Sequence, residues 1–419
     1  MQITPENCVD YIHSLSRFGK KAGLYNITAM LERLGNPHKS LRFIHVAGTN
    51  GKGSVSNMTE NILISHGYKV GYYTSPYIEH FGERICINNV PISNEDLCRY
   101  VNRVREASCD LNPIEFEFIT AIAMCYFLDS GCDVVVLEVG LGGRFDATNV
   151  IDTPLLNIIT PIGLDHTAIL GDTLSQIAFE KAGTIKPGSD VVISPEMHPD
   201  CIEVIRRKCA EMNATLTIVQ NNRSDVSFGE KLTKFTYKGC QYELSLLGEY
   251  QISNAILAIE AATRLKEKLE LFDSDISNGL RTSAWKCRFE VFDSSPRIIL
   301  DGAHNSHGIE ALMRSTELYF KNTEKVFVFS MLNEKDYEKS IELISKQNAK
   351  IIITTVPNLR QTSAEDIFEE VRRRIPEAVF VPDPLEALET AKSAAGVDGA
   401  VFVFGSLYLS GYLRQYVNK

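Results

Sequence analysis

Residues 43–54, FIHVAGTNGKGS, join a short apolar run to a glycine-rich turn and decide the fold class. The run Phe43–Val46 is typical of a buried strand, and residues 48–54 then supply three glycines and a lysine. The helix expected next carries its apolar side chains on one face: Val55, Met58 and Ile62. A second apolar run, Val70–Thr74, begins just beyond its end. This order predicts a strand–helix–strand unit whose loop lies at the carboxyl end of the first strand.

The same alternation of aliphatic runs and helical stretches continues through the chain. Further strands are expected at Asp133–Val139, Leu155–Thr160, Asp190–Ser194, Arg297–Leu300, Val326–Phe329, Ile351–Thr355, Val379–Val381 and Ala400–Phe404. Nearly continuous aliphatic runs suit a parallel sheet covered on both faces. The sequence predicts an α/β protein of two domains. An N-terminal domain with a P-loop ATPase-type parallel sheet should span residues 1–293. A C-terminal Rossmann-like α/β domain should span 297–419, after a turn-rich seam.

Composition limits the class of protein. The chain has 419 residues, 44% hydrophobic and 23% charged, with a formal net charge of −10. These values exclude disordered, collagen-like and coiled-coil chains and argue against nucleic acid as a partner. The N-terminus has no signal-peptide pattern, and no apolar run is long enough for a membrane span, so we expect a cytoplasmic protein with no membrane partner. The ten cysteines form no C-x-x-C pair, so they should be reduced thiols and not zinc ligands.

The glycine-rich turn predicts a nucleotide site. Glycines let backbone N–H groups approach an anion, and the helix N-terminus adds positive potential. The residues expected to bind ATP here are Gly51, Lys52, Gly53 and Ser54, with Lys52 reaching the terminal phosphates. The spacing departs from G-x-x-x-x-G-K-[ST], because Gly48 is too near Gly51. A glycine-rich turn with a purely structural role is the alternative.

The loop is similar to the G-T-x-G-K-[GT]-[ST] variant of the Mur ligase superfamily. The whole chain resembles one branch of it, folylpolyglutamate synthase and dihydrofolate synthase. The further blocks that carry this resemblance run in family order: 75–84 SPYIEHFGER, 116–118 FEF, 138–149 EVGLGGRFDATN, 165–167 DHT, 179–188 FEKAGTIKPG, 247–255 LGEYQISNA, 301–305 DGAHN and 405–409 GSLYL. Each block alone is a weak signal, whereas the ordered set is specific.

The resemblance implies an ATP-dependent ligase that adds L-glutamate to the γ-carboxylate of tetrahydrofolate or its polyglutamates. It leaves open whether L-glutamate is also joined to 7,8-dihydropteroate to give dihydrofolate. A carboxylate is a poor electrophile, so phosphorylation by ATP to an acyl phosphate must precede attack by the amine. Phosphoryl transfer needs positioning and charge neutralisation, so the resemblance also implies Mg²⁺, with two ions expected. A need for K⁺ is left open.

Three residues resemble the magnesium contacts of the family, namely Ser75, Glu138 and His166. Glu138 ends an aliphatic strand, which is where doubly wound sheets place their ligands. A salt-bridged glutamate at a strand end is the alternative for Glu138. His166 is an unusual ligand for a hard metal, and a histidine satisfied within its loop is the alternative there. The resemblance makes His166 catalytic together with Lys52 and Lys181.

Lys181 resembles the family lysine that becomes N6-carboxylysine. Thr173–Gln176 is a capping-box sequence and Gly183 is placed to be the C′ residue, so Lys181 falls in the last turn of a short helix. A lysine there can be a favourable end charge and nothing more. A desolvated lysine, however, loses its proton more readily, and the neutral amine can capture CO₂.

The remaining expected contacts come from the resemblance. For ATP they are Asn254, Arg288, Asp301 and His304. The family often has W-P-G-R where this chain has Trp285–Arg288, which puts the local turn in question. For folate they are Phe116, Glu117, Phe118, Ile119, Phe145, Asp146 and Ala147, together with Gly23-Leu24. The Phe116 and Phe118 stripe can instead be ordinary core. Glutamate is expected near Ser406 and the DGAHN block.

Two other functions fit parts of the sequence. Another Mur-type amino-acid ligase, acting on UDP-muramyl precursors, would need a sizeable domain before the loop, and only 47 residues precede Gly48. A nucleotide-gated switch without ligation is disfavoured by the set of Glu138, His166 and Lys181. Ligand-dependent release of phosphate from ATP distinguishes the switch from the ligase. The protein is expected to be a monomer.

Overall fold

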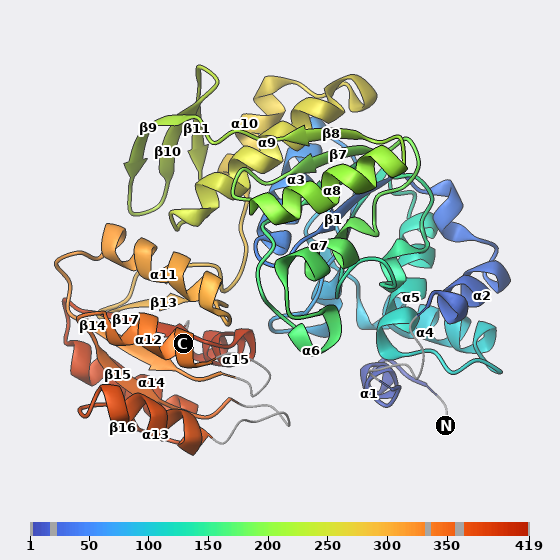
Figure 1. Cartoon of the computed structure of the whole chain (residues 1–419). Helices are drawn as coiled ribbons and strands as arrows, with labels where there is room; N and C mark the ends of the chain where they lie inside the picture. Colours follow the sequence, from blue (N-terminus) through green and yellow to red (C-terminus); the bar gives the residue numbers. More distant parts are fainter. Residues whose placement is uncertain (1–2, 17–22, 332–336, 357–363, 418–419) are drawn as a thin grey trace. The chain divides into compact units, whose positions relative to one another are not determined.

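The computed structural model describes residues 3–16, 23–331, 337–356 and 364–417 (Figure 1). The chain divides into two compact units, and each is described by itself. Unit 1 comprises Met1–Asn221 and Ser253–Thr282, and unit 2 comprises Asn222–Ile252 and Ser283–Lys419. This division differs from the single seam expected between residues 293 and 297, because residues 222–252 and 283–293 pack with the C-terminal sheet.

An eight-stranded sheet in the order β4-β3-β2-β5-β1-β6-β7-β8 forms the centre of unit 1. Its strands are β1 Phe43–Ala47, β2 Val70–Tyr73, β3 Ile85–Ile87, β4 Val90–Pro91, β5 Val134–Glu138, β6 Leu156–Ile159, β7 Asp190–Ile193 and β8 Thr215–Ile218. The pairs from β2 through β8 are parallel, whereas β2–β3 and β3–β4 are antiparallel. Strand β1 lies in the middle, between β5 and β6, so its carboxyl end opens onto the loop at residues 48–54.

Helices cover both faces of this sheet. They are α1 Cys8–His13, α2 Tyr25–Arg33, α3 Lys52–His66, α4 Asn94–Ala107, α5 Glu115–Asp129, α6 Thr167–Leu170, α7 Leu174–Ala182, α8 Pro199–Glu211, α9 Tyr250–Leu269 (which begins in unit 2) and α10 Asp273–Thr282, with 3₁₀ turns η1 Pro37–Ser40, η2 Phe81–Arg84 and η3 Ala147–Val150. Helix α3 is sandwiched between the sheet and α10. A Cβ on Gly279 would lie 2.5 Å from the backbone of Ile62, so this close approach requires glycine.

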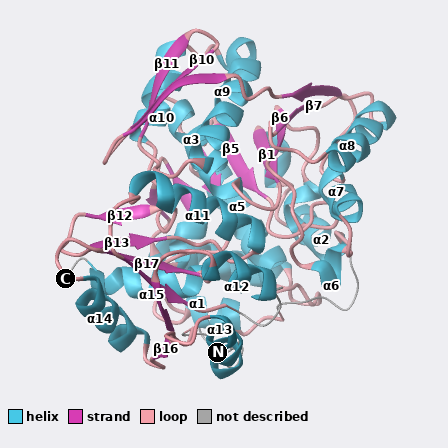
Figure 2. Ribbon diagram, turned by 60° about the vertical axis from the view of Figure 1, so that its left-hand side comes forward, coloured by secondary structure: helices cyan, strands magenta, loops and turns pink. Residues whose placement is uncertain are grey.

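A six-stranded sheet in the order β12-β13-β17-β14-β15-β16 forms the centre of unit 2, which also contains a three-stranded antiparallel sheet in the order β11-β10-β9. The strands are β9 Arg223–Phe228, β10 Thr233–Tyr237, β11 Cys240–Leu244, β12 Glu290–Phe292, β13 Arg297–Leu300, β14 Lys325–Phe329, β15 Lys350–Ile353, β16 Val379–Phe380 and β17 Ala400–Phe404. The helices are α11 Ser306–Tyr319, α12 Tyr337–Ser345, α13 Ala364–Arg374, α14 Pro384–Ala395 and α15 Leu407–Val417 (Figure 2). Five of the six strands run parallel, and β12 is antiparallel to β13.

The α/β fold class is confirmed, and all ten strands expected from aliphatic runs are present to within two residues at each end. Seven strands were missed: β3, β4, β8, β9, β10, β11 and β12. They are short or half-exposed, so they lack the continuous apolar run that signals a buried parallel strand.

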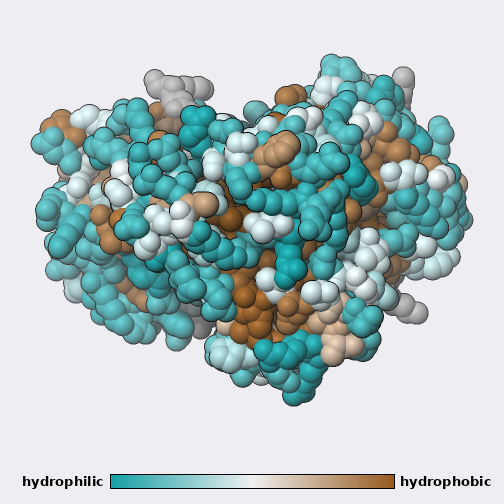
Figure 3. Space-filling view, turned by 90° about the horizontal axis from the view of Figure 1, so that it is seen from above, coloured by the Kyte–Doolittle hydropathy of each residue, from teal (hydrophilic) through white to brown (hydrophobic). Residues whose placement is uncertain are grey.

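The surface and the thiols agree with the composition. The face drawn in Figure 3 is mainly hydrophilic, with hydrophobic areas set between polar ones. All ten cysteines are free, and most of them are buried. Within the part of the chain that the structure describes, no helix combines the length and the apolar character needed to span a bilayer.

Candidate active site

The loop between β1 and α3 needs glycine at two positions. Gly48 has a φ of 145°, and a Cβ there would lie 1.8 Å from the Thr160 hydroxyl oxygen. Gly51 has a φ of 86°, and a Cβ there would lie 2.6 Å from Oδ1 of Asn254. Because neither residue has a side chain, the loop can fold tightly against the N-terminus of α3. A tight glycine loop at a helix N-terminus is the geometry that binds phosphate. Asn254, expected to contact ATP, therefore lies directly against this loop.

The loop is anchored to the segment that follows β6. The backbone N–H groups of Thr49 and Asn50 donate to the carbonyl oxygen of Pro161, over 2.9 and 3.2 Å. The Thr49 hydroxyl donates to the carbonyl of Gly163 and accepts from its N–H group. These bonds fix the first half of the loop, and the backbone N–H groups that follow at the start of α3 are the ones expected to face a bound anion.

Lys52 and Glu138 meet at this end of the sheet. Lys52 Nζ donates to the Thr49 carbonyl oxygen at 3.3 Å and lies 4.0 Å from Glu138 Oε1. Glu138 ends β5 and is only 3% exposed. Its other oxygen, Oε2, accepts a hydrogen bond from the hydroxyl of Thr74, the residue before Ser75. A buried carboxylate is therefore held beside the loop lysine, close in sequence and space to the predicted Ser75 ligand.

Lys181 lies on the other side of the loop. It is 4% exposed, and its Nζ donates to the Gly48 carbonyl oxygen at 2.6 Å. Burial, and secondly the nearby charge of Lys52, lower the pKa of Lys181 to about 7, against the opposing effect of Asp165 and Asp146. Burial thus favours the neutral amine of Lys181, which is the form that can react with CO₂.

The capping box of α7 is confirmed, since Thr173 and Gln176 each bond to the other's backbone N–H group. The expectation for Gly183 is wrong. Gly183 closes α7 in the right-handed region, at a φ of −60°, and not in the left-handed C′ conformation. Glycine is needed there because a Cβ would lie 2.4 Å from Cβ of Arg144. Glycine at this position makes room for the segment at Arg144, and it does not serve as a left-handed cap of the helix.

His166 adopts a left-handed backbone conformation with a φ of 51°. Its N–H group donates to Asp165 Oδ1 at 2.9 Å, and its ring Nε2 lies 3.9 Å from the same oxygen. The side chain is 39% exposed. Both residues belong to the segment anchored to the loop through Pro161, so His166 is presented near the loop and accessible. Lys52, Glu138, Lys181 and the 160–166 segment thus gather around one loop.

The four residues expected to bind folate at the start of α5 differ in what they contact. The Phe116 ring packs against Gly140, where a Cβ would lie 2.6 Å from it. Glu117 accepts from the N–H group of Ile114 and so caps its own helix. Phe118 and Ile119 are fully buried in the hydrophobic core. Packing encloses these two side chains, and their role in binding folate stays a prediction.

The residues expected to bind folate after β5 differ from one another as well. Phe145 is 45% exposed, and the Arg144 guanidinium lies 4.3 Å from its ring centroid and 5.0 Å from that of Phe179. Ala147 is buried in the same core as Phe118, and its role in binding folate stays a prediction. Asp146 is buried but polar: its carboxylate accepts from the N–H groups of Leu141 and Thr148 and from the Thr148 hydroxyl.

Unit 2 holds the other expected ATP contacts. The buried Asp301 carboxylate accepts from the Tyr250 hydroxyl at 2.8 Å and from the N–H groups of Phe289 and Ala303, both at 2.7 Å. Burial raises the pKa of Asp301, and the Arg288 charge opposes that shift. His304 Nδ1 lies 2.7 Å from the Gly302 carbonyl oxygen, so it donates there and the other ring nitrogen faces elsewhere.

The turn at Trp285–Arg288 has the conformation that glycine favours. Cys287 has a φ of 53° and Phe289 one of 47°. Cys287 is the position where the family often has glycine, so the chain keeps the left-handed turn and accepts a modest strain. Arg288 remains in place: a Cβ on Gly302 would lie 2.0 Å from its Nη1.

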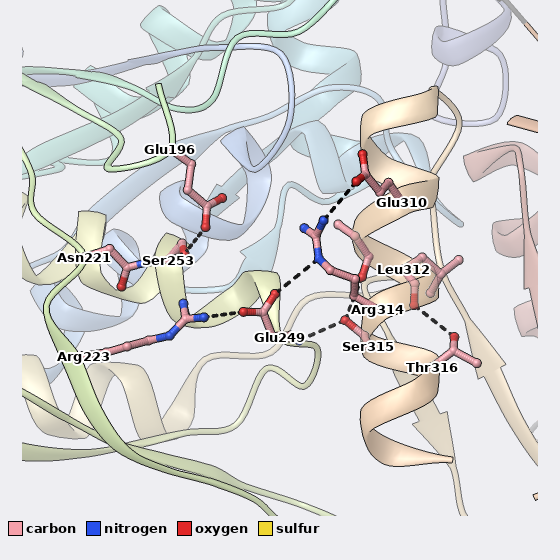
Figure 4. A network of polar contacts seen from close by, with 11 residues as sticks. Glu196, Asn221, Arg223, Glu249, Ser253, Glu310, Leu312, Arg314, Ser315 and Thr316 are labelled. Carbon is pink, nitrogen blue, oxygen red and sulfur yellow. Dashed lines mark hydrogen bonds and ion pairs between the residues drawn. The ribbon is translucent and has the colours of Figure 1, made fainter. Parts of the chain in front are cut away.

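The chain passes between the units at 221–222, 252–253 and 282–283, and each unit has polar contacts at the first two of these points (Figure 4). In unit 1, the Ser253 hydroxyl donates to Glu196 at 2.5 Å and accepts from Asn221. In unit 2, Glu249 pairs with Arg223 and lies 3.8 Å from Arg314. At these two points, each unit therefore holds its end of the chain with its own side chains.

Two polar residues at the site were missed by sequence reasoning, namely Thr74, which bonds Glu138, and Tyr250, which bonds Asp301. Thr74 ends a predicted strand, directly before Ser75, and Tyr250 lies within the LGEYQISNA block. In both cases the sequence signal was a position close to a predicted site residue, Ser75 for Thr74 and Asn254 for Tyr250. Ser406, expected near glutamate, is buried at the end of β17.

Comparison with known proteins identifies the family of the chain. The family model described as Mur ligase middle domain matches residues 46–262, and the one described as Mur ligase, glutamate ligase domain matches residues 287–407. The chain is 37% identical to the dihydrofolate synthase/folylpolyglutamate synthase of Bacillus subtilis, over 97% of each chain.

Two solved structures are similar over nearly the whole length. Folylpolyglutamate synthase from Mycobacterium tuberculosis, complexed with ADP and AMPPCP, has a TM-score of 0.89 at 26% identity and covers 99% of each chain. E. coli FolC in complex with DHPP and ADP has a TM-score of 0.88 at 27% identity, covering 99% of this chain and 97% of that one. With both Mur ligase domains matched and a relative this similar over its full length, the chain belongs to the Mur ligase family, in the branch of folylpolyglutamate synthases and dihydrofolate synthases.

Proposed function

We propose that this chain is an ATP-dependent ligase that joins L-glutamate to the γ-carboxylate of tetrahydrofolate or its polyglutamates. The observation that carries the proposal is the pairing of Lys52 with the buried Glu138 beside a glycine loop, in a chain that aligns end to end with a folylpolyglutamate synthase. Joining L-glutamate to 7,8-dihydropteroate is included as a second activity, because the Bacillus subtilis relative bears both names.

The chemistry proceeds in two steps. A carboxylate oxygen of the folate attacks the γ-phosphorus of ATP, and the bond to the bridging oxygen breaks to release ADP. The amine of glutamate then attacks the carbonyl carbon of the acyl phosphate, loses a proton, and phosphate leaves as the amide forms. Lys52 and the backbone N–H groups of the loop are the proposed contacts of the phosphate oxygens, and Asn254 borders the loop. In unit 2, Arg288 and Asp301 are the proposed nucleotide contacts.

The residues around Glu138 fit Mg²⁺, which supplies charge neutralisation on the phosphates when bound. Within the described ranges there is no cluster of three or more His, Cys, Asp or Glu side chains. Magnesium does not require one, because it is commonly held by one or two carboxylates, with phosphate oxygens and water completing its shell. Glu138 and the Ser75 hydroxyl are the proposed oxygen donors. His166 is the proposed nitrogen donor, and it is the less typical one.

Lys181 is proposed to act as N6-carboxylysine. The ammonium group first loses one proton. The neutral amine then attacks CO₂, a carbon–nitrogen bond forms and a second proton is released, so that over both steps a cation becomes a carboxylate. Its pKa near 7 and its burial beside Gly48 support this reaction, since the amine is available and the product is shielded from water. The new carboxylate would serve a second Mg²⁺. The need for K⁺ and the cytoplasmic location stay predictions, the former tested by exchanging KCl for NaCl.

The pteridine is proposed to bind beside Asp146, with Phe116 and Phe145 offering ring surfaces. Asp146 lies within the 138–149 stretch that begins at Glu138, and Phe116 packs against Gly140 of the same stretch. A ligand bound there would therefore extend from the pteridine toward the site of phosphoryl transfer.

Purified protein assayed with ATP and L-glutamate tests the function, with tetrahydrofolate or dihydropteroate as acceptor in parallel reactions. We expect ADP release that depends on both the acceptor and glutamate, with a glutamyl-extended product in the mass spectrum. ADP release with neither acceptor nor glutamate, and no extended product, would contradict the ligase. Turnover with UDP-linked substrates alone would identify another Mur-type amino-acid ligase.

A further inference from the structure

A buried histidine lies in the central strand of unit 1, at a position where a strand covered on both faces normally has an apolar residue. His45 is in β1, opposite Leu137 of β5 and Asn157 of β6, and it is 1% exposed. Burial, and to a smaller extent the charge of Lys186, lower the pKa of His45 to about 3, so the ring is neutral at physiological pH. A neutral imidazole has one N–H donor and one acceptor nitrogen.

The ring contacts a hydroxyl that in turn contacts Asp146. His45 Nε2 lies 2.9 Å from Thr148 Oγ1, and Thr148 Oγ1 lies 2.6 Å from Asp146 Oδ1. The N–H groups of Thr148 and Leu141 also donate to this carboxylate, one to each oxygen. Burial raises the pKa of Asp146, whereas these hydrogen bonds oppose that shift and favour the ionised acceptor. The single hydroxyl proton of Thr148 therefore points to Asp146.

The direction of this hydrogen bond fixes the other one. Thr148 Oγ1 has used its proton, so it can only accept from His45, and Nε2 must carry the ring hydrogen. The remaining nitrogen, Nδ1, is buried with no hydrogen-bond partner among the described residues. An orphaned buried acceptor is unfavourable for the folded state. An apolar residue would avoid that cost. The hydrogen bond that Nε2–H donates to Thr148 is therefore the reason for a histidine at position 45.

We propose that His45 and Thr148 are positioning residues that hold the Asp146 carboxylate in the orientation that accepts a hydrogen bond from the pteridine ring. The inference rests on the proposed function, because it assumes that Asp146 faces the pteridine. Neither residue touches the reacting atoms. The two hydrogen bonds link a rigid central strand, through the Thr148 hydroxyl, to a carboxylate at the start of η3. The rigid sheet therefore holds the side chain that contacts the ligand.

Thr148→Val and Thr148→Ser form the matched pair that tests this proposal. Valine has nearly the shape of threonine but no hydroxyl, whereas serine keeps the hydroxyl and loses the methyl group. We expect Thr148→Val to raise the KM for dihydropteroate or tetrahydrofolate by about 5- to 30-fold. The KM for ATP and the KM for glutamate should change by less than about 2-fold, and Thr148→Ser should stay near the wild type.

His45→Leu and His45→Gln give a second, independent pair. Leucine removes the donor together with the orphaned acceptor, so we expect the Tm to be retained while the pteridine KM rises. Glutamine keeps an N–H donor and should restore part of the affinity. In the wild type, ¹⁵N NMR should show the Nε2–H tautomer with no titration between about pH 5 and 8.

The outcomes separate the two proposals. An inactive wild type with every pteridine acid would contradict the proposed function itself. An active wild type whose pteridine KM is unchanged in both Thr148→Val and His45→Leu would overturn the positioning role. A uniform loss of Tm, kcat and all three affinities would also overturn it, since that result marks a purely structural part. If Thr148→Val does not fold, the His45 pair and direct binding of dihydropteroate decide.

Discussion

Lys181 donates a hydrogen bond to the carbonyl oxygen of Gly48, 2.6 Å away, and so ties the end of α7 to the first residue of the nucleotide loop. The loop, the lysine and Lys52 thereby form one local charge system, in which two cations lie close enough for Lys52 to lower the pKa of Lys181. Conversion of Lys181 to a carbamate would turn this repulsion into attraction. The modification would therefore organise the loop side chains as well as supply a carboxylate.

Replacing Lys181 should abolish ligation while leaving the fold intact. Lys181→Ala removes a buried, partly charged amine, so we expect unchanged or raised thermal stability at pH 7 and a loss of at least about 100-fold in kcat. Added short carboxylates such as acetate should restore part of the rate by occupying the vacated space. Lys208→Met, at a half-buried ion-pair residue of α8, is the control and should keep full activity. Full activity in Lys181→Ala would contradict the carbamate.

Thr74 should matter through Glu138. Glu138→Gln removes the charge proposed to hold Mg²⁺, and we expect a drop of about 100- to 1,000-fold in kcat. Thr74→Val only removes a hydrogen bond to that carboxylate, so the expected effect is a rise in the Mg²⁺ concentration needed for half-maximal rate, by about 5- to 30-fold.

Thr74→Ser is the matched control, because it keeps the hydroxyl that donates to Glu138. Titration of activity with MgCl₂ at saturating ATP and folate measures the effect. Identical Mg²⁺ dependence in Thr74→Val and the wild type would show that the hydroxyl does not position the carboxylate.

Gly51 should be needed for more than its backbone conformation. Gly51→Ala both places a side chain at a φ of 86° and sets a Cβ 2.6 Å from Asn254 Oδ1. Gly35 has nearly the same φ, 87°, but open space around its missing Cβ. Each substitution should cost about 1–2 kcal/mol of stability from backbone strain. Only Gly51→Ala should also raise the KM for ATP, because it displaces Asn254 and the loop. Equal kinetics in the two variants would show that the contact is irrelevant.

The sequence predicted the parallel strands well because each is buried on both faces and so is continuously aliphatic, as in β5 and β14. It missed β9–β11, whose half-exposed residues carry no such run. At the site, motif position predicted Lys52, Glu138 and Lys181 beside the loop. Motif position could not predict that Phe116 and Phe118 have different surroundings. They share a motif but lie on different sides of α5, Phe116 against Gly140 and Phe118 in the core. Helix rotation and hydrogen-bond partners are set by tertiary packing.

Glu60 gives the protein a pH-dependent stability that is separate from catalysis. It lies fully buried in α3, accepting from the N–H group of Asn89 at 3.0 Å through one carboxylate oxygen. The other oxygen, Oε2, has no partner among the described residues. Burial raises the pKa of Glu60 to about 8 from an ordinary value of 4.5. The folded chain therefore binds more protons at this residue than the unfolded chain does between these two values.

The sign of the effect follows from that difference. The contribution of Glu60 to stability is fully present below about pH 4.5, declines by at most about 1.4 kcal/mol per pH unit as the pH rises, and is lost above about pH 8. Glu60→Gln, which is neutral at every pH, should melt at the same temperature as the wild type near pH 4.5 and at a higher one at pH 8. Glu106→Gln, at an exposed position of α4, should show no such widening gap. Parallel melting curves for Glu60→Gln and the wild type from pH 4.5 to 8 would show that the carboxyl group ionises freely in the folded protein.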